Sequence, residues 1–135
     1  FSITEKQLRR AGLDYWSMLD IHHHDSIAAF LTLHEQSPLW FFTTKGTKTH
    51  VQAVFDDEAY LVFGKESAGI DESILVRHPD RCLRIPMLQG ARSLNLSNSV
   101  AIAAYEYERQ HQFSSLTREG RLHRLSWEAQ RSVNE

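Results

Sequence analysis

Three short apolar runs, separated by segments with helical character, constrain the fold of this chain most. They cover residues 39–43, 60–63 and 82–85, and each is of strand length and rich in aromatic or β-branched residues. Apolar and polar residues mostly do not alternate in them, which is typical of strands buried on both faces. Strands that alternate with helices predict an α/β protein with a parallel sheet.

Helices are expected between and after these runs. One begins near Asp25 or Ser26, either of which can cap it. A second runs from a cap at Asp71 to about Arg77, and the Pro79 that follows disfavours helix at the preceding residue. Residues 95–110 predict the longest helix, which is apolar nearly all round and is therefore expected to be buried.

Composition places the chain among ordinary globular proteins. Its 135 residues fit one domain, with 41% hydrophobic and 24% charged residues. No apolar run approaches the roughly 18 residues that span a bilayer, and the charged first ten residues do not resemble a signal peptide. The single cysteine, Cys82, cannot form an internal disulfide and is expected to be a buried thiol. The expected compartment is the cytoplasm.

The net charge of −2 excludes a protein that binds nucleic acid by bulk charge. A local basic patch can still contact RNA. The candidates are Lys6, Arg9 and Arg10 near the start of the chain, then Lys45 and Lys48, and the alternative is that these are solvated surface residues.

A loop with two glycines, Gly64-Lys65-Glu66-Ser67-Ala68-Gly69, follows the second apolar run. Glycines allow backbone to approach a ligand closely and permit positive φ. The loop is neither a dinucleotide fingerprint nor a P-loop, because Glu66 replaces the middle glycine and no lysine follows Gly69. On its own, an ordinary turn explains it equally well.

A second loop, Arg92-Ser93-Leu94-Asn95-Leu96-Ser97-Asn98, enters the long helix. Helix capping explains one or two of its polar residues. The others precede a helix that is expected to be buried, so they need partners in a neighbouring segment or a ligand. Ligands of α/β proteins bind beyond the carboxyl ends of the strands. The two loops together therefore suggest a nucleotide-like cofactor held by backbone groups.

Metal and nucleophilic chemistry are not favoured. The run His22-His23-His24-Asp25 is the obvious metal candidate, but adjacent side chains point in different directions and no second cluster has metal-ligand spacing. These histidines are expected to lie in a solvent-exposed loop. No Gly-x-Ser-x-Gly sequence is present, and Cys82 lies within a strand, where it suits packing better than attack.

Several segments, taken in order, resemble the SpoU class of RNA 2′-O-methyltransferases over residues 8–112. They are Leu-Arg-Arg-Ala-Gly-Leu-Asp-Tyr-Trp at 8–16, Thr-Thr-Lys-Gly at 43–46, the run from Leu61 to Gly69, Arg-Ile-Pro-Met at 84–87, and residues 92–98. Several motifs that occur in the family's order and at the family's spacing indicate the family more specifically than any single motif does. Residues 10–15 are most similar to the small single-domain members that methylate the wobble nucleotide of tRNA.

The resemblance implies an α/β domain over residues 1–113 with a deep trefoil knot near its C-terminal end. Knots are rare, and composition alone cannot indicate one. It also implies a homodimer that binds S-adenosylmethionine in the knot and methylates the ribose 2′-hydroxyl of the wobble nucleotide in the tRNA anticodon loop, without a metal. Residues 114–135 are a charged extension, expected to be helical or disordered.

The resemblance also assigns site residues. Those that match cofactor-binding positions, mostly through their backbone, are Phe42, Gly64, Ile85 and Ser93, with Leu94 against the adenine or the methionine part. Those that match catalytic-site positions are Glu66, Ser93 and Asn95. Phosphate contacts are expected from Arg9, Arg10, Lys45 and Lys48.

One family feature falls outside these residues. The family's first motif, with an asparagine and the arginine that activates the ribose hydroxyl, precedes the segment matching residues 1–12. A polypeptide without it is expected to be inactive and to lack the first strand. Three alternatives therefore stay open: a non-catalytic RNA- or nucleotide-binding module, methylation of another tRNA or rRNA site, and a plain ligand-binding or dimerisation domain.

Overall fold

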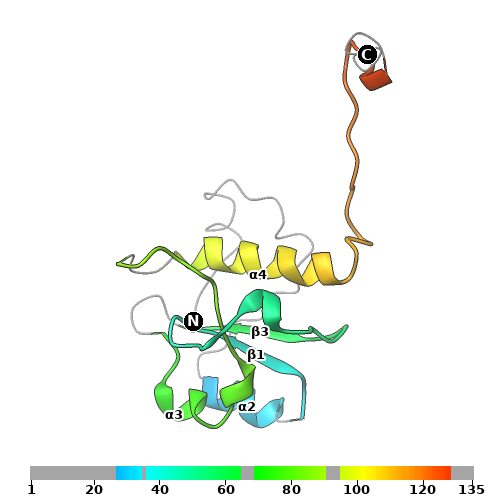
Figure 1. The fold of residues 1–135 in the computed structure, drawn as a ribbon. Helices are drawn as coiled ribbons and strands as arrows, with labels where there is room; N and C mark the ends of the chain where they lie inside the picture. The colour runs from blue at the N-terminus through cyan, green and yellow to red at the C-terminus, as the bar shows by residue number, and fades with distance from the viewer. Residues whose placement is uncertain (1–26, 35, 65–68, 91–94, 129–135) are drawn as a thin grey trace.

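Four strands form one sheet in the computed structural model, which describes residues 27–34, 36–64, 69–90 and 95–128 (Figure 1). The elements in chain order are α2 (Ile27–Leu33), β1 (Leu39–Phe42), β2 (Lys48–Thr49), the 3-10 helix η2 (His50–Gln52), β3 (Tyr60–Phe63), α3 (Glu72–Leu75), the 3-10 helix η3 (Pro79–Arg81), β4 (Cys82–Arg84) and α4 (Leu96–Gln110).

All strand pairs are parallel, in the order β2-β4-β1-β3. The prediction of an α/β protein with a parallel sheet is therefore confirmed, and the three apolar runs are β1, β3 and β4. Strand β2 was not predicted, because it contains only Lys48 and Thr49 and has no apolar run. It pairs with β4 at the edge of the sheet.

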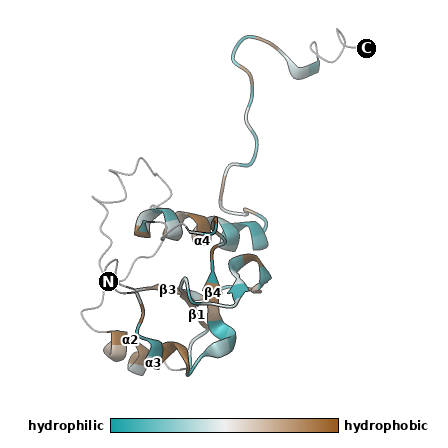
Figure 2. Ribbon diagram, turned by 60° about the vertical axis from the view of Figure 1, so that its left-hand side comes forward, coloured by the Kyte–Doolittle hydropathy of each residue, from teal (hydrophilic) through white to brown (hydrophobic). Residues whose placement is uncertain are grey.

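Side chains of β1 alternate between the two faces of the sheet. Trp40 and Phe42 pack against α4, and Leu39 and Phe41 pack on the side of α2 and α3. Figures 1 and 2 show α4 on one side of the sheet and α2 and α3 on the other. The first core consists of Trp40, Phe42, Ala53, Phe55, Phe63, Leu83, Val100, Ala103 and Ala104, and the second of Phe30, Leu39, Phe41, Ile70, Ile74, Leu75 and Cys82.

Helix α4 forms where it was predicted, but it is not buried all round. Val100, Ala103 and Ala104 are buried against the sheet, whereas Tyr105 is 47% exposed and Arg109 is also exposed. The apolar residues of this helix cover one stripe, which is the pattern of a helix that packs on one face of a sheet.

The cap of α3 is confirmed, since the Asp71 carboxylate accepts a hydrogen bond from the Ser73 N–H at 3.1 Å. The helix ends at Leu75, two residues earlier than predicted. Cys82 is buried as predicted, and its thiol donates to the carbonyl of His78 at 3.2 Å. Burial raises the pKa of this thiol. Among the described residues, no helix is long and apolar enough to cross a membrane.

Candidate functional site at the carboxyl edge of the sheet

The loops that follow β1, β3 and β4 start side by side. Phe42, the last residue of β1, is in register with Phe63 on one side and Leu83 on the other. Gly64 and Ile85 follow directly after these strands, so the structure brings together three of the predicted cofactor positions, Phe42, Gly64 and Ile85. The predicted residues Glu66, Ser93, Leu94, Arg9 and Arg10 lie outside the described residues.

Phe42 occupies this edge through its backbone. Its side chain is buried, and the ring stacks on that of Phe63 with centroids 4.9 Å apart. The ring of Phe42 therefore packs in the core. A ligand at this edge would therefore meet the main chain of Phe42, as the resemblance implies.

Gly64 lies against the chain that returns from the following loop. A Cβ atom at this position would lie 2.6 Å from the backbone nitrogen of Ile70 and 2.7 Å from the carbonyl carbon of Gly69. The close approach that requires glycine here is thus to the protein's own backbone. Gly69 has φ +71°, which confirms the expected positive φ in this loop.

The loop after β1 approaches β4 closely and forms an ion pair with the start of α3. A Cβ on Gly46 would lie 3.0 Å from the carbonyl carbon of Leu83 in β4. Lys45 Nζ forms an ion pair of 2.8 Å with Glu72 at the start of α3. Both side chains are more than half exposed, so the pair contributes little to stability.

Lys48, the other described candidate for RNA contact, is exposed on the edge strand β2. Thr49, the next residue, is in register with Arg84 at the end of β4. Arg84 is a third cation near this edge that the sequence interpretation did not select.

Asn95 is the N-cap of α4. Its Oδ1 accepts hydrogen bonds from the N–H of Asn98 at 2.9 Å and from the hydroxyl of Ser97 at 3.0 Å. Asn95 and Asn98 are exposed, so the expectation that the polar residues of this loop are buried is wrong for these two. The NH2 group of Asn95 forms no hydrogen bond with the described residues and can donate to a ligand.

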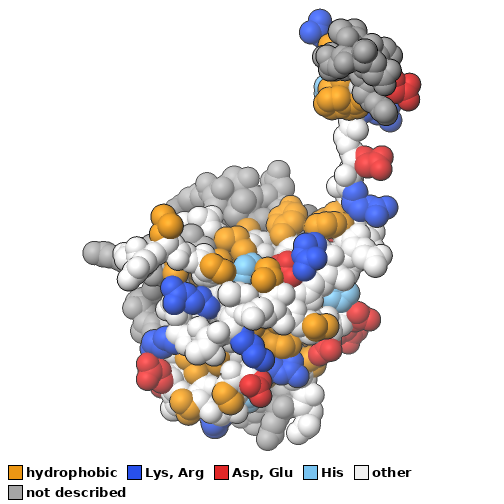
Figure 3. Space-filling model, viewed as in Figure 1, with side chains coloured by type: hydrophobic (Ala, Val, Ile, Leu, Met, Phe, Trp, Pro, Cys, Tyr) orange, Lys and Arg blue, Asp and Glu red, His pale blue; other side chains and the backbone are white. Residues whose placement is uncertain are grey.

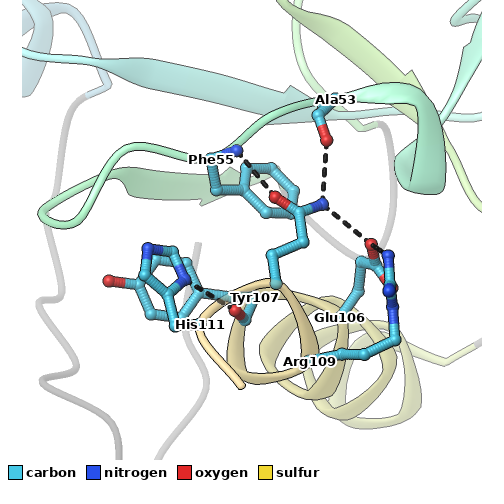
Figure 4. A network of polar contacts seen from close by, with 7 residues as sticks. Ala53, Phe55, Glu106, Tyr107, Arg109 and His111 are labelled. Carbon is cyan, nitrogen blue, oxygen red and sulfur yellow. Dashed lines mark hydrogen bonds and ion pairs between the residues drawn. The ribbon is translucent and has the colours of Figure 1, made fainter. Parts of the chain in front are cut away.

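The end of α4 carries a polar network that the sequence interpretation missed (Figure 4). The Gln110 amide accepts from the N–H of Phe55 and donates to the carbonyl of Ala53 and to Glu106, each at 2.8 Å. Arg109 binds the same carboxylate of Glu106, and these hydrogen bonds lower the pKa of Glu106 despite its burial. The network fastens α4 to the segment between η2 and β3.

A second contact fastens the same end of α4 to the turn that precedes β3. The Tyr107 hydroxyl donates to the carbonyl of Asp57, and His111 Nε2 lies 3.1 Å from the Asp57 carboxylate. Burial, followed by the charge of Asp57, raises the pKa of Tyr107. No periodicity or motif links these residues, which lie about fifty positions apart.

Metal ligands do not gather in the described part of the chain, where no group of three or more His, Cys, Asp or Glu side chains could hold an ion. The histidines at positions 22–24 lie outside it.

The chain is similar to known RNA methyltransferases over most of its length. Residues 1–105 match the model of the SpoU rRNA methylase family. A tRNA (cytidine(34)-2′-O)-methyltransferase of Escherichia coli K12 is 42% identical over 111 residues, which are 82% of this chain and 71% of that protein. The enzyme of the same name from Saccharophagus degradans is 42% identical over 115 residues, covering 84% and 75% of the two chains.

A solved structure shows the same similarity. A structure described as giving insights into the 2′-OH methylation of C/U34 on tRNA superposes with a TM-score of 0.64 and 42% identity, covering 84% of this chain and 74% of the other. With the family model matched over more than half of the sequence, this chain belongs to the SpoU rRNA methylase family.

Proposed function

We propose that this protein methylates the ribose 2′-hydroxyl of the tRNA wobble nucleotide, with S-adenosylmethionine as the methyl donor. The observation that carries the proposal is the 42% identity, over more than four fifths of the chain, to enzymes named for this reaction. The geometry supports it, because the matched motifs after β1, β3 and β4 start from one edge of the sheet.

The residues at this edge fit a nucleoside cofactor. Ile85 and Leu96 pack against the same core cluster as Phe42 and Phe63, so apolar surface connects the end of β4 with the start of α4. The backbone at Phe42, Gly64 and Ile85, together with Ser93 and Leu94, would hold the cofactor. When bound, S-adenosylmethionine supplies a methyl group activated by a sulfonium.

The protein's own contribution is to place the ribose hydroxyl in line with that methyl group. In-line placement removes much of the entropic cost of a bimolecular displacement. Asn95 can donate through its NH2 group, which bonds to none of the described residues, while its Oδ1 caps α4 and so fixes the direction of the carboxamide. Ser93 and Glu66 would orient the ribose or the arginine of the family's first motif. That arginine would assist removal of the hydroxyl proton.

The finer features of the family are part of the same proposal. The segment between β4 and α4 would pass through a loop to form the trefoil knot, and two copies would form a homodimer with active sites near the interface. Lys45 and Lys48, with Arg9 and Arg10, would contact phosphates near the anticodon loop and so position the RNA. Action on tRNA would place the protein in the cytoplasm.

A methyl-transfer assay tests the function. Unmodified tRNA and radiolabelled S-adenosylmethionine are incubated with the 135-residue chain and with a chain that also carries the family's first motif. The methylated nucleotide is then mapped. We expect a 2′-O-methyl group at position 34 from the longer chain. No transfer to any tRNA by that chain would refute the proposal, and transfer at another position would refute the wobble assignment.

The variant Ser93→Ala tests the site. We expect turnover to fall at least about tenfold, as is typical when a group that orients reacting atoms is removed. Ser99→Ala, inside α4, is the matched control and should retain activity. Full turnover by Ser93→Ala would remove this serine from the catalytic site.

A further inference from the structure

The segment after α4 leaves the domain at a fixed turn. The N–H groups of Gln112 and Phe113 donate to the carbonyls of Arg109 and Glu108, at 3.0 and 2.7 Å, which is the Schellman pattern. Gln112 and Phe113 have φ of +62° and +52°. Residues 114–128, here called the C-terminal arm, then extend away from the domain (Figures 1 and 3). The arm lies beyond residue 105, where the match to the family model ends.

The arm is basic although the chain as a whole is acidic. Residues 114–128 contain Arg118, Arg121 and Arg124 against the carboxylates Glu119 and Glu128, so the arm carries a net charge of +1, whereas the whole chain has a net charge of −2. The three arginines are exposed. Within the described residues they form no ion pair or hydrogen bond, so their guanidinium groups are available to a partner.

The arm also carries an exposed indole. Trp127 is 65% exposed and Leu125 is 66% exposed. Tryptophan is seldom left this accessible, because its ring gains free energy when it is removed from water. An aromatic ring beside several arginines is the combination with which proteins bind single-stranded nucleic acid: the rings stack on bases and the cations contact phosphates.

We propose that the C-terminal arm binds an unpaired part of the RNA substrate, with its arginines on phosphates and Trp127 stacked on a base. The identity of that RNA as tRNA rests on the proposed function. An extended chain of 15 residues can reach about 50 Å, so the arm can contact nucleotides remote from the one that is methylated. Docking on another protein would use Leu125 and Trp127 but would leave the excess of positive charge without a counterpart, so the charges favour RNA.

Binding of an unmodified tRNA transcript at several salt concentrations tests the proposal. The proteins are the 135-residue chain, the triple variant R118Q/R121Q/R124Q and Trp127→Ala. We expect the triple variant to reduce the slope of log affinity against log salt by about 2, since each phosphate contact on a single strand contributes about 0.7. Trp127→Ala should weaken binding at least about fivefold.

Matched variants distinguish the effects of the positive charges and of the aromatic ring from the effect of side-chain size. R118K/R121K/R124K keeps the charges and should keep the slope, and Trp127→Phe should lose less affinity than Trp127→Ala. Because the arm extends away from the described part of the domain, the melting temperature should stay the same throughout (Figure 3). Unchanged affinity and slope in the triple glutamine variant would overturn the proposal.

Two further results separate this proposal from its alternatives. If removal of residues 114–135 changes the oligomeric state but not tRNA affinity, the arm is a protein contact and the RNA proposal is wrong. If the arm variants bind tRNA as tightly as the parent chain does, and the parent chain methylates tRNA, the proposal for the arm is wrong and the proposed function stands. Arm-dependent binding of tRNA without methylation, by a chain that carries the first motif, supports the arm and refutes the proposed function.

Discussion

Arg109 donates two hydrogen bonds to Glu106, one helical turn earlier in α4, and each is 2.8 Å long. The carboxylate is 7% exposed, so this pairing keeps a nearly buried charge compensated. The hydrogen bonds from Arg109 hold the pKa of Glu106 below its ordinary value, and Gln110 adds to the effect.

The first prediction concerns the pH dependence of stability. A carboxylate whose pKa is lower in the folded state stabilises the fold above its unfolded pKa, and this contribution is lost as the pH falls through the folded pKa. The free energy of unfolding should therefore decrease as the pH falls below about 5. In Glu106→Gln that decrease should be smaller, and stability at pH 7 should be about 1–2 kcal/mol lower.

Urea unfolding at a series of pH values checks this prediction. Glu72→Gln is the control, since Glu72 is 69% exposed and its ion pair with Lys45 contributes little. A pH profile of Glu106→Gln that matches the parent would show that another carboxylate governs acid stability.

The second prediction concerns the amide of Gln110. It satisfies the carbonyl of Ala53 and the N–H of Phe55, which lie on the segment that leads into β3. Gln110→Ala leaves both backbone groups without their partner, and we expect a loss of about 2–3 kcal/mol in the free energy of unfolding. Gln89→Ala, at an exposed turn, should change it by less than about 0.5 kcal/mol. A small effect of Gln110→Ala would mean that water replaces the amide.

The third prediction concerns the backbone approach at Gly64. In Gly64→Ala the new methyl group would clash with the backbone of Ile70, so stability should fall by at least about 1–3 kcal/mol. Gly120→Ala is the matched control, because nothing lies within 4 Å of its Cβ position. Thermal unfolding of both variants measures the difference. Equal melting temperatures would show that the loop after β3 can move away without cost.

The fourth prediction concerns the turn that ends α4. Gln112 has φ +62°, a conformation that glycine adopts without the strain of a side chain. Gln112→Gly should therefore increase the free energy of unfolding by about 0.5–1 kcal/mol, whereas Gln112→Ala, which keeps the strain, should not. Chemical denaturation of the two variants provides the measurement. A destabilised glycine variant would indicate that the glutamine side chain supports the turn.

The core elements could be predicted because their signals are local. The runs Leu39–Phe42, Tyr60–Phe63 and Cys82–Arg84 are apolar over strand length, and each forms a strand. Asp71 and Asn95 precede helices and cap them. Composition and spacing fixed neither the order of the strands nor the approach of Ile70 to Gly64, because both depend on segments that meet only in three dimensions.

The site could be predicted only in part. Phe42, Gly64 and Ile85 came from ordered motifs, and the strand register places them at one edge. The contacts of Gln110 with Ala53 and Phe55 escaped prediction, because a polar residue near a helix end gives no sign of a partner more than fifty positions away. For Asn95 the resemblance implied a catalytic-site position, whereas capping was expected of one or two polar residues of this loop without naming them. The structure shows that Asn95 is the cap.

The strand order has a consequence for biosynthesis. In the described sheet β4 is the last strand in the sequence, yet it lies between β2 and β1, which are both made earlier. As the chain emerges from the ribosome, the edge of β1 at Phe41 and Phe42 stays unpaired until residue 84 has appeared, and β2, which pairs only with β4 in the described sheet, has no partner. During that interval a nascent polypeptide exposes two aromatic residues and an unpaired strand edge, and a chaperone that shields them would raise the yield of native protein.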